Sequence, residues 1–560
     1  MWISSAALLD DGKLVAAAAE ERFNRQKMSK VFPERAAAFC LKEAGLTWKD
    51  IDRVVMAWNP APHIRAASSR YTNTTRWRGE YLANVPANVL RQLGSPDPLR
   101  IEERLVLDGH TVEILYVDHH QAHAASAFFL SPFESAAVLT LDGRGEDETT
   151  TLALADGNGI RKLRSVVMPH SIGLLYSTLT EYLGFKAHTD EWKVMALGSY
   201  GRPGNEYVEK ISRLITVLDD GRFELDLSYF DYYQFDSRPS MFTGKLVDLL
   251  GPARRPSDPY EQKHNDIAWA MQHVFETNVS RILEALHRET GETRLVLAGG
   301  AAMNSVYNGK IAAMTPFKDV FIPSCPDDTG VSIGAALYAH HCLLGGGNRW
   351  RQTHNFWGPR FSDDEIRDTL DRYKITAERV EDIEQATAEL LAAGKLVGWF
   401  QGRMEFGQRA LGNRSILADP RSERSKELVN AAVKYREGFR PFAPAVLDAF
   451  KDEYFELPEG VSVPFMEKVF PVRPEKRDAI PAVVHVDGSG RLQTVDRETN
   501  PRFHTLIERF HALTGVPVVL NTSFNLNGEP VVCTPTDAIR TFYSCGLDAL
   551  VLGNWLVRKN

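Results

Sequence analysis

The feature that most constrains this chain is a group of histidines between a predicted strand and a predicted helix. Residues 112–117 (VEILYV) are mostly apolar and favour a strand, and residues 124–130 (AASAFFL) favour a helix. His119 and His123 are four residues apart, so on a helix they project from one face and can bind one metal ion. The alternative is a polar helix start with one capping histidine and hydrogen-bonded neighbours, which is the commoner meaning of an isolated pair.

Two acidic segments favour the metal interpretation. Asp142 ends a predicted buried strand and is followed by glycines, so a metal or phosphate can approach the backbone there, although Asp-Gly is also a common turn pair. Asp328 opens a small-residue helix. Two imidazole nitrogens and two carboxylates suit Fe, Mn or Zn, whereas calcium prefers oxygen ligands alone. The proposed metal ligands are therefore His119, His123, Asp142 and Asp328.

The length of 560 residues predicts more than one domain, because a single hydrophobic core does not grow that large. Residues 344–348 (LGGGN) and the polar stretch after them are typical of a linker. We therefore expect two domains. Their boundaries are a first domain at 1–345, a linker at 346–362 and a second domain at 363–560.

Periodicity and turn residues predict further elements. Strands are expected at 5–9, 14–19, 51–58, 136–141, 151–155, 295–298, 396–400 and 518–520, and helices at 33–44, 171–184, 264–287, 364–373 and 385–393. The polar segment 65–104 is expected to be a solvated helical insertion, with a lid over a substrate as the alternative.

The composition argues against several classes of protein. A formal net charge of −8 argues against a nucleic-acid-binding protein, which needs a basic face. Five cysteines without a Cys-x-x-Cys pair indicate neither a disulfide framework nor a thiolate zinc site, and they fit a reducing cytosol. No apolar run is long enough to span a bilayer, so we expect a cytoplasmic protein without membrane contact.

A second candidate site lies where an apolar strand meets Gly299 and Gly300. A helix start with Asn304 follows, and free N–H groups at such a turn suit an anion the size of a nucleotide. Gly143, beside the acidic turn, permits a similar close approach. Lys193 could contact a ligand phosphate, but a surface ion pair explains it equally well.

The second domain contains cations in unusual surroundings. They lie among glycines and apolar residues, where an unpaired charge is costly to bury, so a bound polyanion explains them better than a set of surface charges. These cations are Arg409, Arg414, Lys434 and Arg440. A buried strand then leads to neutral hydrogen-bonding groups at Asn521, Thr522, Ser523 and Asn525.

The order of these motifs resembles the NodU/CmcH-type O-carbamoyltransferases, the family of the tobramycin carbamoyltransferase, over nearly the whole chain. The motifs are His119-His-x-x-His-Ala-Ala-Ser126, Asp142-Gly-Arg-Gly145, Gly299-Gly-x-x-x-Asn304, Asp328-x-Gly-x-x-x-Gly334, Arg409-Ala-Leu-Gly-Asn-Arg-Ser415 and Asn521-Thr-Ser-Phe-Asn525. The resemblance implies an N-terminal actin/Hsp70-like ATPase domain, akin to the tRNA threonylcarbamoyl-transfer enzyme, and a C-terminal YrdC-like α/β domain.

The resemblance also implies a reaction. The C-terminal domain would convert carbamoyl phosphate and ATP, with Mg²⁺, to carbamoyl adenylate. Its phosphate contacts would come from Arg409, Arg414, Lys434, Arg440, Asn521, Ser523 and Asn525, with Arg414 and Lys434 also catalytic. The intermediate would pass internally to Fe²⁺, or another divalent ion, at the histidine–aspartate set. A hydroxyl of a natural product such as an antibiotic would take the carbamoyl group, and AMP would leave.

One departure concerns the start of the chain. The family usually carries a histidine just before the first strand, where this chain has residues 1–4 (MWIS). Either the true start lies upstream, which we favour because a missing strand exposes a sheet edge, or His120 or another group activates the acceptor. The acceptor stays open among aminoglycosides, macrolide sugars, ansamycins and lipo-oligosaccharides, with segments 65–104 and 203–262 expected to select it. A homodimer also stays open.

Two other functions compete with this one. The acidic charge argues against threonylcarbamoyl transfer to tRNA. The absence of zinc-finger cysteines argues against hydrogenase-maturation chemistry. A non-catalytic ATP-binding switch of the actin/Hsp70 type leaves the cations of the second domain unexplained.

Overall fold

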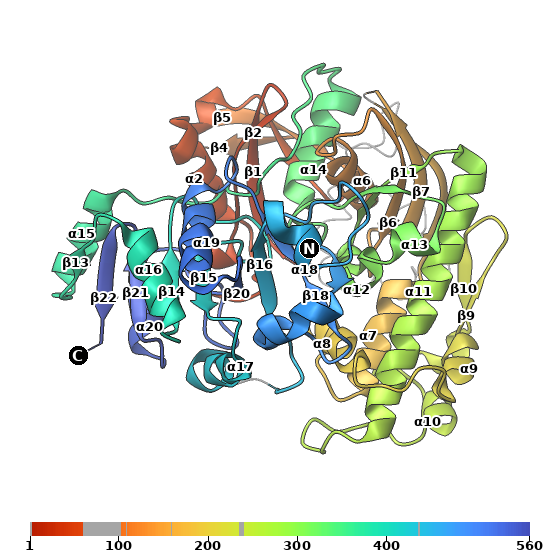
Figure 1. The fold of residues 1–560 in the computed structure, drawn as a ribbon. Coiled ribbons are helices and arrows are strands. Elements are labelled where there is room, and N and C mark those ends of the chain that lie inside the picture. The colour runs from red at the N-terminus through yellow and green to blue at the C-terminus, as the bar shows by residue number, and fades with distance from the viewer. Residues whose placement is uncertain are drawn as a thin grey trace.

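The computed structural model describes residues 3–59, 102–107, 109–157, 159–233, 240–434 and 437–559. In these residues the chain forms two large mixed β-sheets with helices packed against them, which confirms the predicted α/β class (Figure 1). The insertion predicted at 65–104 lies outside the described residues, except for its last three, which belong to a strand. Within the described part of the chain, no helix is both long and apolar enough to cross a bilayer.

A five-stranded sheet organises the N-terminal half, by which we mean the described residues up to 345. Its strand order is β12-β11-β6-β7-β8. β6 pairs in parallel with β11, and β11 with β12, whereas β7 is antiparallel to both of its neighbours. The strands are β6 (Ser135–Leu141), β7 (Glu148–Asp156), β8 (Gly159–Val167), β11 (Arg294–Ala298) and β12 (Asp319–Phe321).

Both faces of this sheet are covered because neighbouring strand residues point to opposite sides. Leu139 and Leu297 pack in the core that contains α7 (Ile172–Tyr182) and α11 (Gln262–Thr290). Val138 and Val296 pack instead in the core that contains α6 (His119–Phe128) and α14 (Val331–Tyr338). α6 therefore lies against the sheet with its histidine-bearing N-terminus near the carboxyl end of β6.

Smaller elements complete the N-terminal half. The predicted hairpin and the helix ending at Gly45, which adopts a left-handed φ of 69°, are both present. The strands are β1 (Ser5–Asp10), β2 (Lys13–Ala19), β3 (Arg53–Met56), β4 (Glu102–Leu107), β5 (His110–Tyr116), β9 (Ile215–Val217) and β10 (Phe223–Leu225). The helices are α1 (Glu21–Asn24), α2 (Glu34–Ala44), α8 (Glu191–Gly198), α9 (Tyr207–Ser212), α10 (Gly244–Leu250), α12 (Ser305–Asn308) and α13 (Ile311–Met314).

An eight-stranded sheet organises the C-terminal half, by which we mean the described residues from 363 onward. Its order is β13-β22-β21-β14-β15-β20-β16-β19, and one large core containing Trp399 and Leu520 packs against it. The strands are β13 (Glu378–Arg379), β14 (Val397–Phe400), β15 (Arg414–Ala418), β16 (Ala443–Leu447), β19 (Gln493–Val495), β20 (Val518–Ser523), β21 (Ala549–Leu552) and β22 (Trp555–Arg558), with a separate pair β17 (Val469–Pro471) and β18 (Ser489–Arg491). The helices are α15 (Asp363–Arg372), α16 (Ile383–Ala392), α17 (Glu423–Val429), α18 (Lys451–Tyr454), α19 (Pro501–Thr514) and α20 (Pro535–Tyr543).

One expectation about this half needs correction. Asn521, Thr522 and Ser523 lie within β20 and pair with β15, whereas the sequence suggested that they follow the strand. The segment 346–362, predicted as a linker, contacts the N-terminal half. Its Arg349 donates hydrogen bonds to the carbonyls of Phe128, Ser131 and Phe133, so it closes the C-terminal end of α6.

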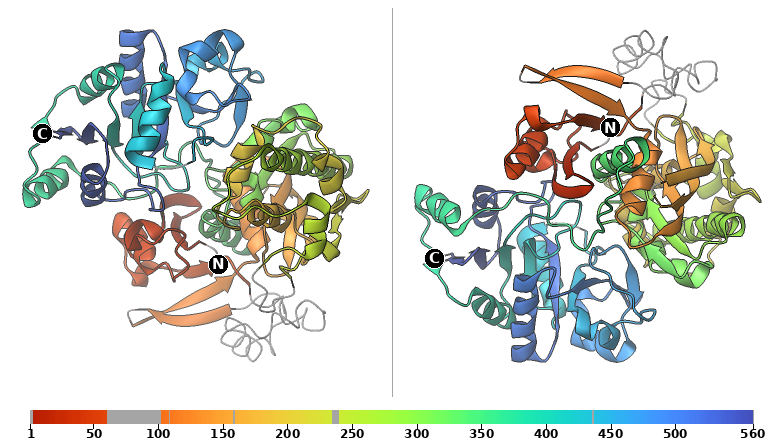
Figure 2. Two further views of the ribbon diagram at one scale, coloured as in Figure 1. Left: turned by 90° about the horizontal axis from the view of Figure 1, so that it is seen from below. Right: turned by 90° about the horizontal axis from the view of Figure 1, so that it is seen from above.

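The N-terminal hairpin joins the two halves. Ser5 Oγ donates a hydrogen bond to Thr329 O (2.8 Å), just before α14. Arg403 of the C-terminal half donates to Val15 O at 3.2 Å. Figure 2 shows the hairpin and α2, in red, beside both halves where they meet. The relative position of the halves is therefore fixed by contacts on this side of the molecule.

α6 and α14 approach each other closely at Gly334. A Cβ at this position would lie 1.9 Å from Ala122 O, so no side chain fits without moving one helix. We predict that Gly334→Ala lowers the free energy of unfolding by about 1–3 kcal/mol, as overpacking does elsewhere, and also weakens metal binding by the histidines of α6.

The measurement is urea unfolding together with titration of a divalent metal. Gly244→Ala is the matched control, because a Cβ at helical Gly244 meets nothing within 4 Å. In this control the free energy of unfolding should stay unchanged or rise by up to about 1 kcal/mol. Equal effects of the two substitutions would contradict the prediction.

Candidate functional site

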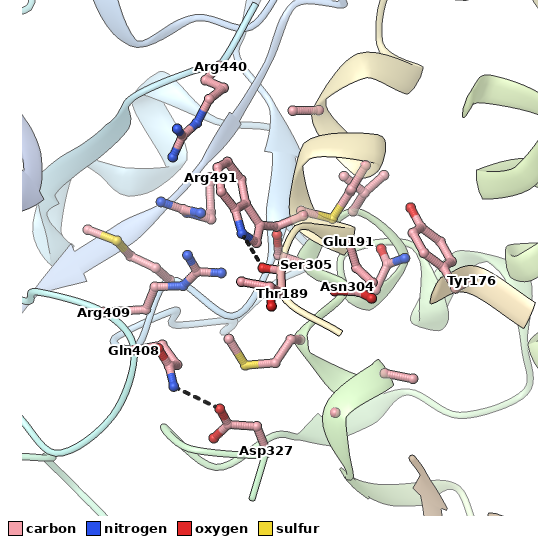
Figure 3. A pocket seen from close by; sticks show the side chains of 18 of the residues that line it. Tyr176, Thr189, Glu191, Asn304, Ser305, Asp327, Gln408, Arg409, Arg440 and Arg491 are labelled. Atoms are coloured by element: carbon pink, nitrogen blue, oxygen red, sulfur yellow. Dashed lines mark hydrogen bonds between the residues drawn. The ribbon is translucent and has the colours of Figure 1, made fainter. Parts of the chain in front are cut away.

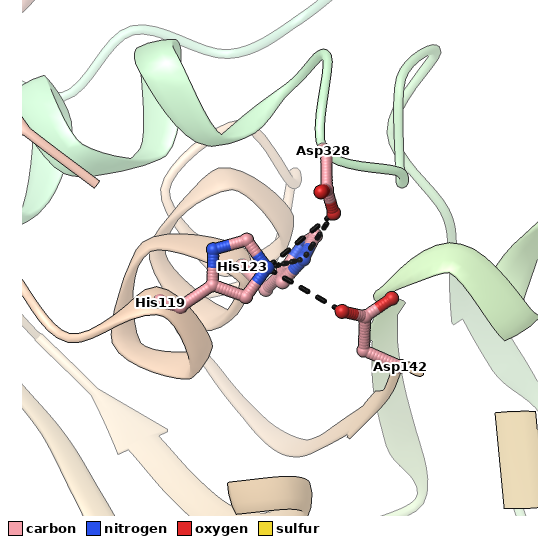
Figure 4. Close-up of side chains that lie close together, drawn as sticks. All are labelled: His119, His123, Asp142 and Asp328. Atoms are coloured by element: carbon pink, nitrogen blue, oxygen red, sulfur yellow. Dashed lines mark hydrogen bonds and ion pairs between the residues drawn. The ribbon is translucent and has the colours of Figure 1, made fainter. Parts of the chain in front are cut away.

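The four predicted metal ligands converge on one point. Each offers a ligand atom, and these atoms all lie within 4.8 Å of one another (Figure 4). His119 Nε2 lies 3.1 Å from His123 Nε2 and 3.4 Å from both Asp142 Oδ2 and Asp328 Oδ1. His123 Nε2 lies 3.5 Å from Asp328 Oδ1. All four side chains are buried.

Secondary structure fixes the orientation of these ligands. His119 and His123 share one face of α6, Asp142 follows β6, and Asp328 precedes α14. His119 Nδ1 lies 3.2 Å from Ala57 O and donates to it, so the lone pair of Nε2 faces the other ligands. The backbone N–H of Gly300 donates to Asp142 Oδ1 at 2.8 Å, which leaves Oδ2 for the centre. Neighbouring groups thus aim each ligand inward.

This donor set fits a divalent ion. Ligand atoms about 2.0–2.2 Å from a shared ion lie about 3–3.5 Å from one another, close to the separations observed. Asp328 Oδ2 is buried and has no hydrogen-bond partner within the described ranges. Burial opposes both charges, yet the two histidines lower the pKa of Asp328, and the carboxylates raise the pKa of His119 well above its ordinary value. A cation would balance the two carboxylates directly.

A cavity of about 470 Å³ extends from this cluster into the C-terminal half. Figure 3 shows Arg409, Arg440 and Arg491 on one side of it, and Tyr176, Glu191 and Asn304 on the other. Asp142 and Asp328 lie at the end of the cavity beside the histidines. The histidine–aspartate cluster and the cationic wall therefore open into the same space.

Two arginines of this wall differ in how they are held. Arg409 makes no hydrogen bond or ion pair among the residues that the structure describes, and burial lowers its pKa to about 10. Arg440 stacks on Trp192, with its guanidinium carbon 3.8 Å from the ring centroid, and lies 3.4 Å from Glu437. Arg409 therefore has its donors available for an anion, and Arg440 is oriented from the other half of the chain.

The structure assigns Arg414 a different task from the predicted one. Its side chain is fully buried, does not line the cavity, and lies over the Phe400 ring at 3.6 Å. Its guanidinium donates hydrogen bonds to the backbone carbonyls of Gln401, Asn413, Pro359 and Gly402. Because these donors are used by the backbone, we do not retain Arg414 as a phosphate ligand or a catalytic residue.

Lys434 and Asn525 also lie behind the cavity wall. Lys434 Nζ donates to Ser523 O at 2.6 Å and to Asn525 Oδ1 at 2.9 Å, and neither Lys434 nor Asn525 is a lining residue. Ser523 itself lines the cavity and donates to Asn525 Oδ1 at 2.6 Å. Lys434 therefore orders the end of β20, in place of the direct phosphate contact that the sequence suggested.

His120 and Lys193 are also occupied by protein groups. His120 Nδ1 lies 2.6 Å from Thr140 Oγ1 and its Nε2 lies 3.1 Å from Glu148 O, while burial lowers its pKa to about 3. This geometry gives no support to His120 as the acceptor base. Lys193 forms ion pairs with Asp190 and Glu437, which is the surface-pair alternative considered for it.

The remaining predicted residues lie at the cavity or directly behind it. Those that line it are Gly143, Gly300, Asn304, Arg409, Arg440, Asn521, Thr522 and Ser523. Gly299 lies behind the wall with a φ of 96°, and a Cβ there would be 2.1 Å from Leu141 O. Only glycine permits this approach of two backbone segments.

Sequence reasoning missed several residues of the site. Glu146 accepts the backbone N–H of His119 at 3.0 Å, which fixes the start of α6, and burial raises its pKa to about 8. Gln408, Trp192 and Arg491 line the cavity. Gln408 and Arg491 carried a signal, since the first adjoins Arg409 and the second ends a Gly-Ser-Gly turn. Two contacts with distant parts of the chain carried none: Gln408 donates to Asp327, 81 residues away, and Trp192 lies under Arg440 of the other half.

Comparison with known proteins identifies the family. Residues 2–337 match the family model described as carbamoyltransferase N-terminus, and residues 388–559 match the one described as carbamoyltransferase C-terminus. The chain belongs to the carbamoyltransferase family. Similar proteins include sll1178 of Synechocystis sp., 40% identical over 99% of this chain and 95% of the relative, and nodulation protein NolNO of Sinorhizobium fredii, 37% identical over 100% and 79%.

Two further similarities are more limited. The 3'-hydroxymethylcephem-O-carbamoyltransferase of Amycolatopsis lactamdurans is 33% identical over 51% of this chain and 52% of the relative. The crystal structure of T. kodakarensis HypF is 16% identical, with a TM-score of 0.29 over 61% of this chain and 48% of that chain. In this carbamoyltransferase both family regions contribute to one cavity, the first through the histidine–aspartate cluster and the second through the arginine wall.

The two arginines of the 409–415 motif predict opposite phenotypes. Arg414→Gln removes donors from buried carbonyls, so the free energy of unfolding should fall by about 1–3 kcal/mol. Arg409→Gln should change it by less than about 0.5 kcal/mol, because no partner in the described chain is lost, and should instead weaken pyrophosphate binding. Urea unfolding and calorimetric titration measure the two effects. Unfolding of both variants at the same urea concentration would contradict the assignment.

Proposed function

We propose that this chain is an ATP-dependent O-carbamoyltransferase that activates carbamoyl phosphate as carbamoyl adenylate and carbamoylates a hydroxyl of a natural product. The observation that carries the proposal is the single cavity, with a buried cluster of two histidines and two aspartates at one end and guanidinium groups on its wall. The names of similar proteins support the hydroxyl acceptor, since one carbamoylates a hydroxymethylcephem. A nodulation protein and an antibiotic-type enzyme among the relatives leave the acceptor class open.

The activation step needs positive charge. Water cleaves carbamoyl phosphate to carbamate and phosphate, and a carbamate oxygen then attacks the α-phosphorus of ATP, whose bond to pyrophosphate breaks. Charge develops on phosphate oxygens throughout, and guanidinium groups in a partly dehydrated cavity stabilise it more strongly than water does. Arg409, Arg440 and Arg491 supply these groups, with Asn521 and Ser523 as neutral donors on the same wall. Mg²⁺ accompanies ATP in this proposal.

The transfer step takes place toward the other end of the cavity. The acceptor oxygen attacks the carbamoyl carbon, its proton is released, and the bond to the AMP oxygen breaks. His119, His123, Asp142 and Asp328 would hold a divalent ion, for which we propose Fe²⁺. Such an ion supplies Lewis-acid stabilisation of phosphate or carbonyl oxygens. Because both sites share one cavity, the intermediate, a group that is unstable in water, need not leave the protein between the two steps.

The finer fold assignments belong to the same proposal. A mixed five-stranded sheet covered by helices on both faces supports an actin/Hsp70-like N-terminal domain over 1–345. The eight-stranded sheet, whose strands all come after residue 363, supports a YrdC-like C-terminal domain over 363–560. Carbamoyl phosphate, ATP and a hydroxylated small molecule are the proposed partners of a cytoplasmic enzyme.

The two half-reactions predict separable defects. Wild-type protein should exchange labelled pyrophosphate into ATP only when carbamoyl phosphate is present. His123→Ala should keep this exchange. Its metal affinity should fall at least about tenfold, and carbamoyl transfer should be lost with the metal. Arg409→Gln should lose exchange and keep metal. Isotope counting and metal analysis of the purified variants measure both properties.

His504→Ala is a matched control, because His504 pairs with Glu508 on α19 and is not a cavity residue. This variant should keep both exchange and metal. A wild-type protein that shows no carbamoyl-phosphate-dependent exchange would refute the proposed activation, whatever its metal content.

A further inference from the structure

Two loops from opposite halves of the chain meet beside the cavity. Residues 405–411 belong to the C-terminal half and carry Arg409, and residues 324–329 belong to the N-terminal half and carry Asp328. The side chain of Gln408 joins them (Figure 3). Its Nε2 donates to Asp327 Oδ2 at 3.0 Å and to Thr329 Oγ1 at 3.3 Å. Gln408 thus adjoins an anion-facing arginine and binds both sequence neighbours of a candidate metal ligand.

The Cys325 thiol of one loop packs against the backbone of the other. Cys325 Sγ donates to Phe406 O at 2.8 Å. Gly407 has a φ of 124°, and a Cβ there would lie 2.4 Å from Cys325 Sγ. Such contact leaves no room for one loop to slide past the other without breaking these bonds. A shift of either loop is therefore transmitted to its partner.

Each loop is also held firmly on its own side. Glu405 Oε1 accepts the backbone N–H of Leu411 at 2.7 Å and of Asn413 at 2.8 Å, which braces the turn containing Arg409. Ser5 Oγ donates to Thr329 O, which braces the opposite loop. Two braced segments connected by the Gln408 amide and the Cys325 thiol behave as a linked pair, in contrast to flexible chain that absorbs displacement.

We propose that Gln408 is a positioning residue that couples anion binding at Arg409 to metal binding at the histidine–aspartate cluster. This inference deepens the proposed function, on which it rests. An anion that draws the Arg409 turn toward the cavity acts through the Gln408 amide on residues 327–329, and so on the carboxylate of Asp328. Coupling of this kind is reciprocal, so bound metal strengthens anion binding by the same factor that the anion strengthens metal binding.

The coupling factor is the ratio of the Co²⁺ dissociation constants without and with sulfate, and it can be measured without turnover. Co²⁺ is titrated into the purified protein with and without saturating sulfate, and its visible absorption bands report binding at the histidines. In wild-type protein sulfate should tighten Co²⁺ binding by at least about fivefold. Gln408→Met keeps the side-chain volume and removes both hydrogen bonds, so the factor should fall below about twofold while Co²⁺ still binds. Thr329→Val removes the longer bond alone and should give an intermediate factor.

Two control variants distinguish this role of Gln408 from a general weakening of the contacts between the halves. Arg403→Gln breaks another contact between the halves, to Val15 O, and a contact with the linker, to Trp357 O. Both lie outside the lining of the cavity, so this variant should leave the factor at its wild-type value. Arg409→Gln should abolish the sulfate effect.

An unchanged factor in Gln408→Met, or a wild-type factor near one, would overturn the inference. Pyrophosphate exchange tests the proposed function independently. A wild-type protein without exchange, but with the expected coupling factor, would refute the proposed function alone. A wild-type protein with exchange, together with a Gln408→Met variant that keeps the wild-type coupling factor, would refute this inference alone.

Discussion

Two buried carboxylates, Asp142 and Asp328, set the main constraint on this structure. Isolated carboxylates are costly to bury. Here Asp142 lies beside Nε2 of His119, and Asp328 lies beside Nε2 of both His119 and His123. Their positions depend on the sheet between α7 and α14, because β6 delivers one carboxylate and the turn before α14 delivers the other. Gly334 matters for the same reason, since only close packing of α6 on α14 brings the imidazoles within reach.

The buried arginines illustrate a second constraint. A guanidinium has five donors, and burial is tolerated only where acceptors use them. The backbone carbonyls around β14 and β15 use those of Arg414, whose role is to hold protein together. Arg409 lies five residues earlier on the same turn and faces the cavity with no such acceptors in the described chain. Identical side chains therefore divide into a structural and a ligand-facing group according to the acceptors around them.

The dependence of a side chain on its surroundings also explains which features could be predicted from the sequence. Apolar periodicity located β6, α11 and β14, because local patterns determine which residues face a core. The four candidate ligands were found because helical spacing and strand ends fix side-chain direction. His120, the alternative acceptor base, belongs to the same helix, but its partners give that role no support. One residue after His119 is a rotation of about 100°, which turns His120 toward Thr140 and Glu148 of the sheet.

Arg414, Lys434 and Gln408 could not be assigned from sequence for a different reason. Their partners are backbone carbonyls or side chains on other elements, and Gln408 is 81 residues from Asp327. Composition and spacing show that a cation or an amide is present, but its acceptors appear only when the chain is folded. Residues that act through distant partners are therefore the ones that sequence reasoning misses here.

The arrangement of charge in the cavity has a consequence for its chemistry. The chain as a whole is acidic, with a net charge of −8, yet Arg409, Arg440 and Arg491 gather on one wall while Asp142 and Asp328 lie at one end. Charges inside a partly dehydrated cavity interact more strongly than the screened charges on the surface. An anionic ligand therefore experiences a directional field, with its phosphates drawn to the guanidinium wall and excluded from the carboxylate end. A divalent cation at the histidines and aspartates would neutralise the two carboxylates, so the repulsion of an anionic ligand from that end depends on whether the cluster is filled.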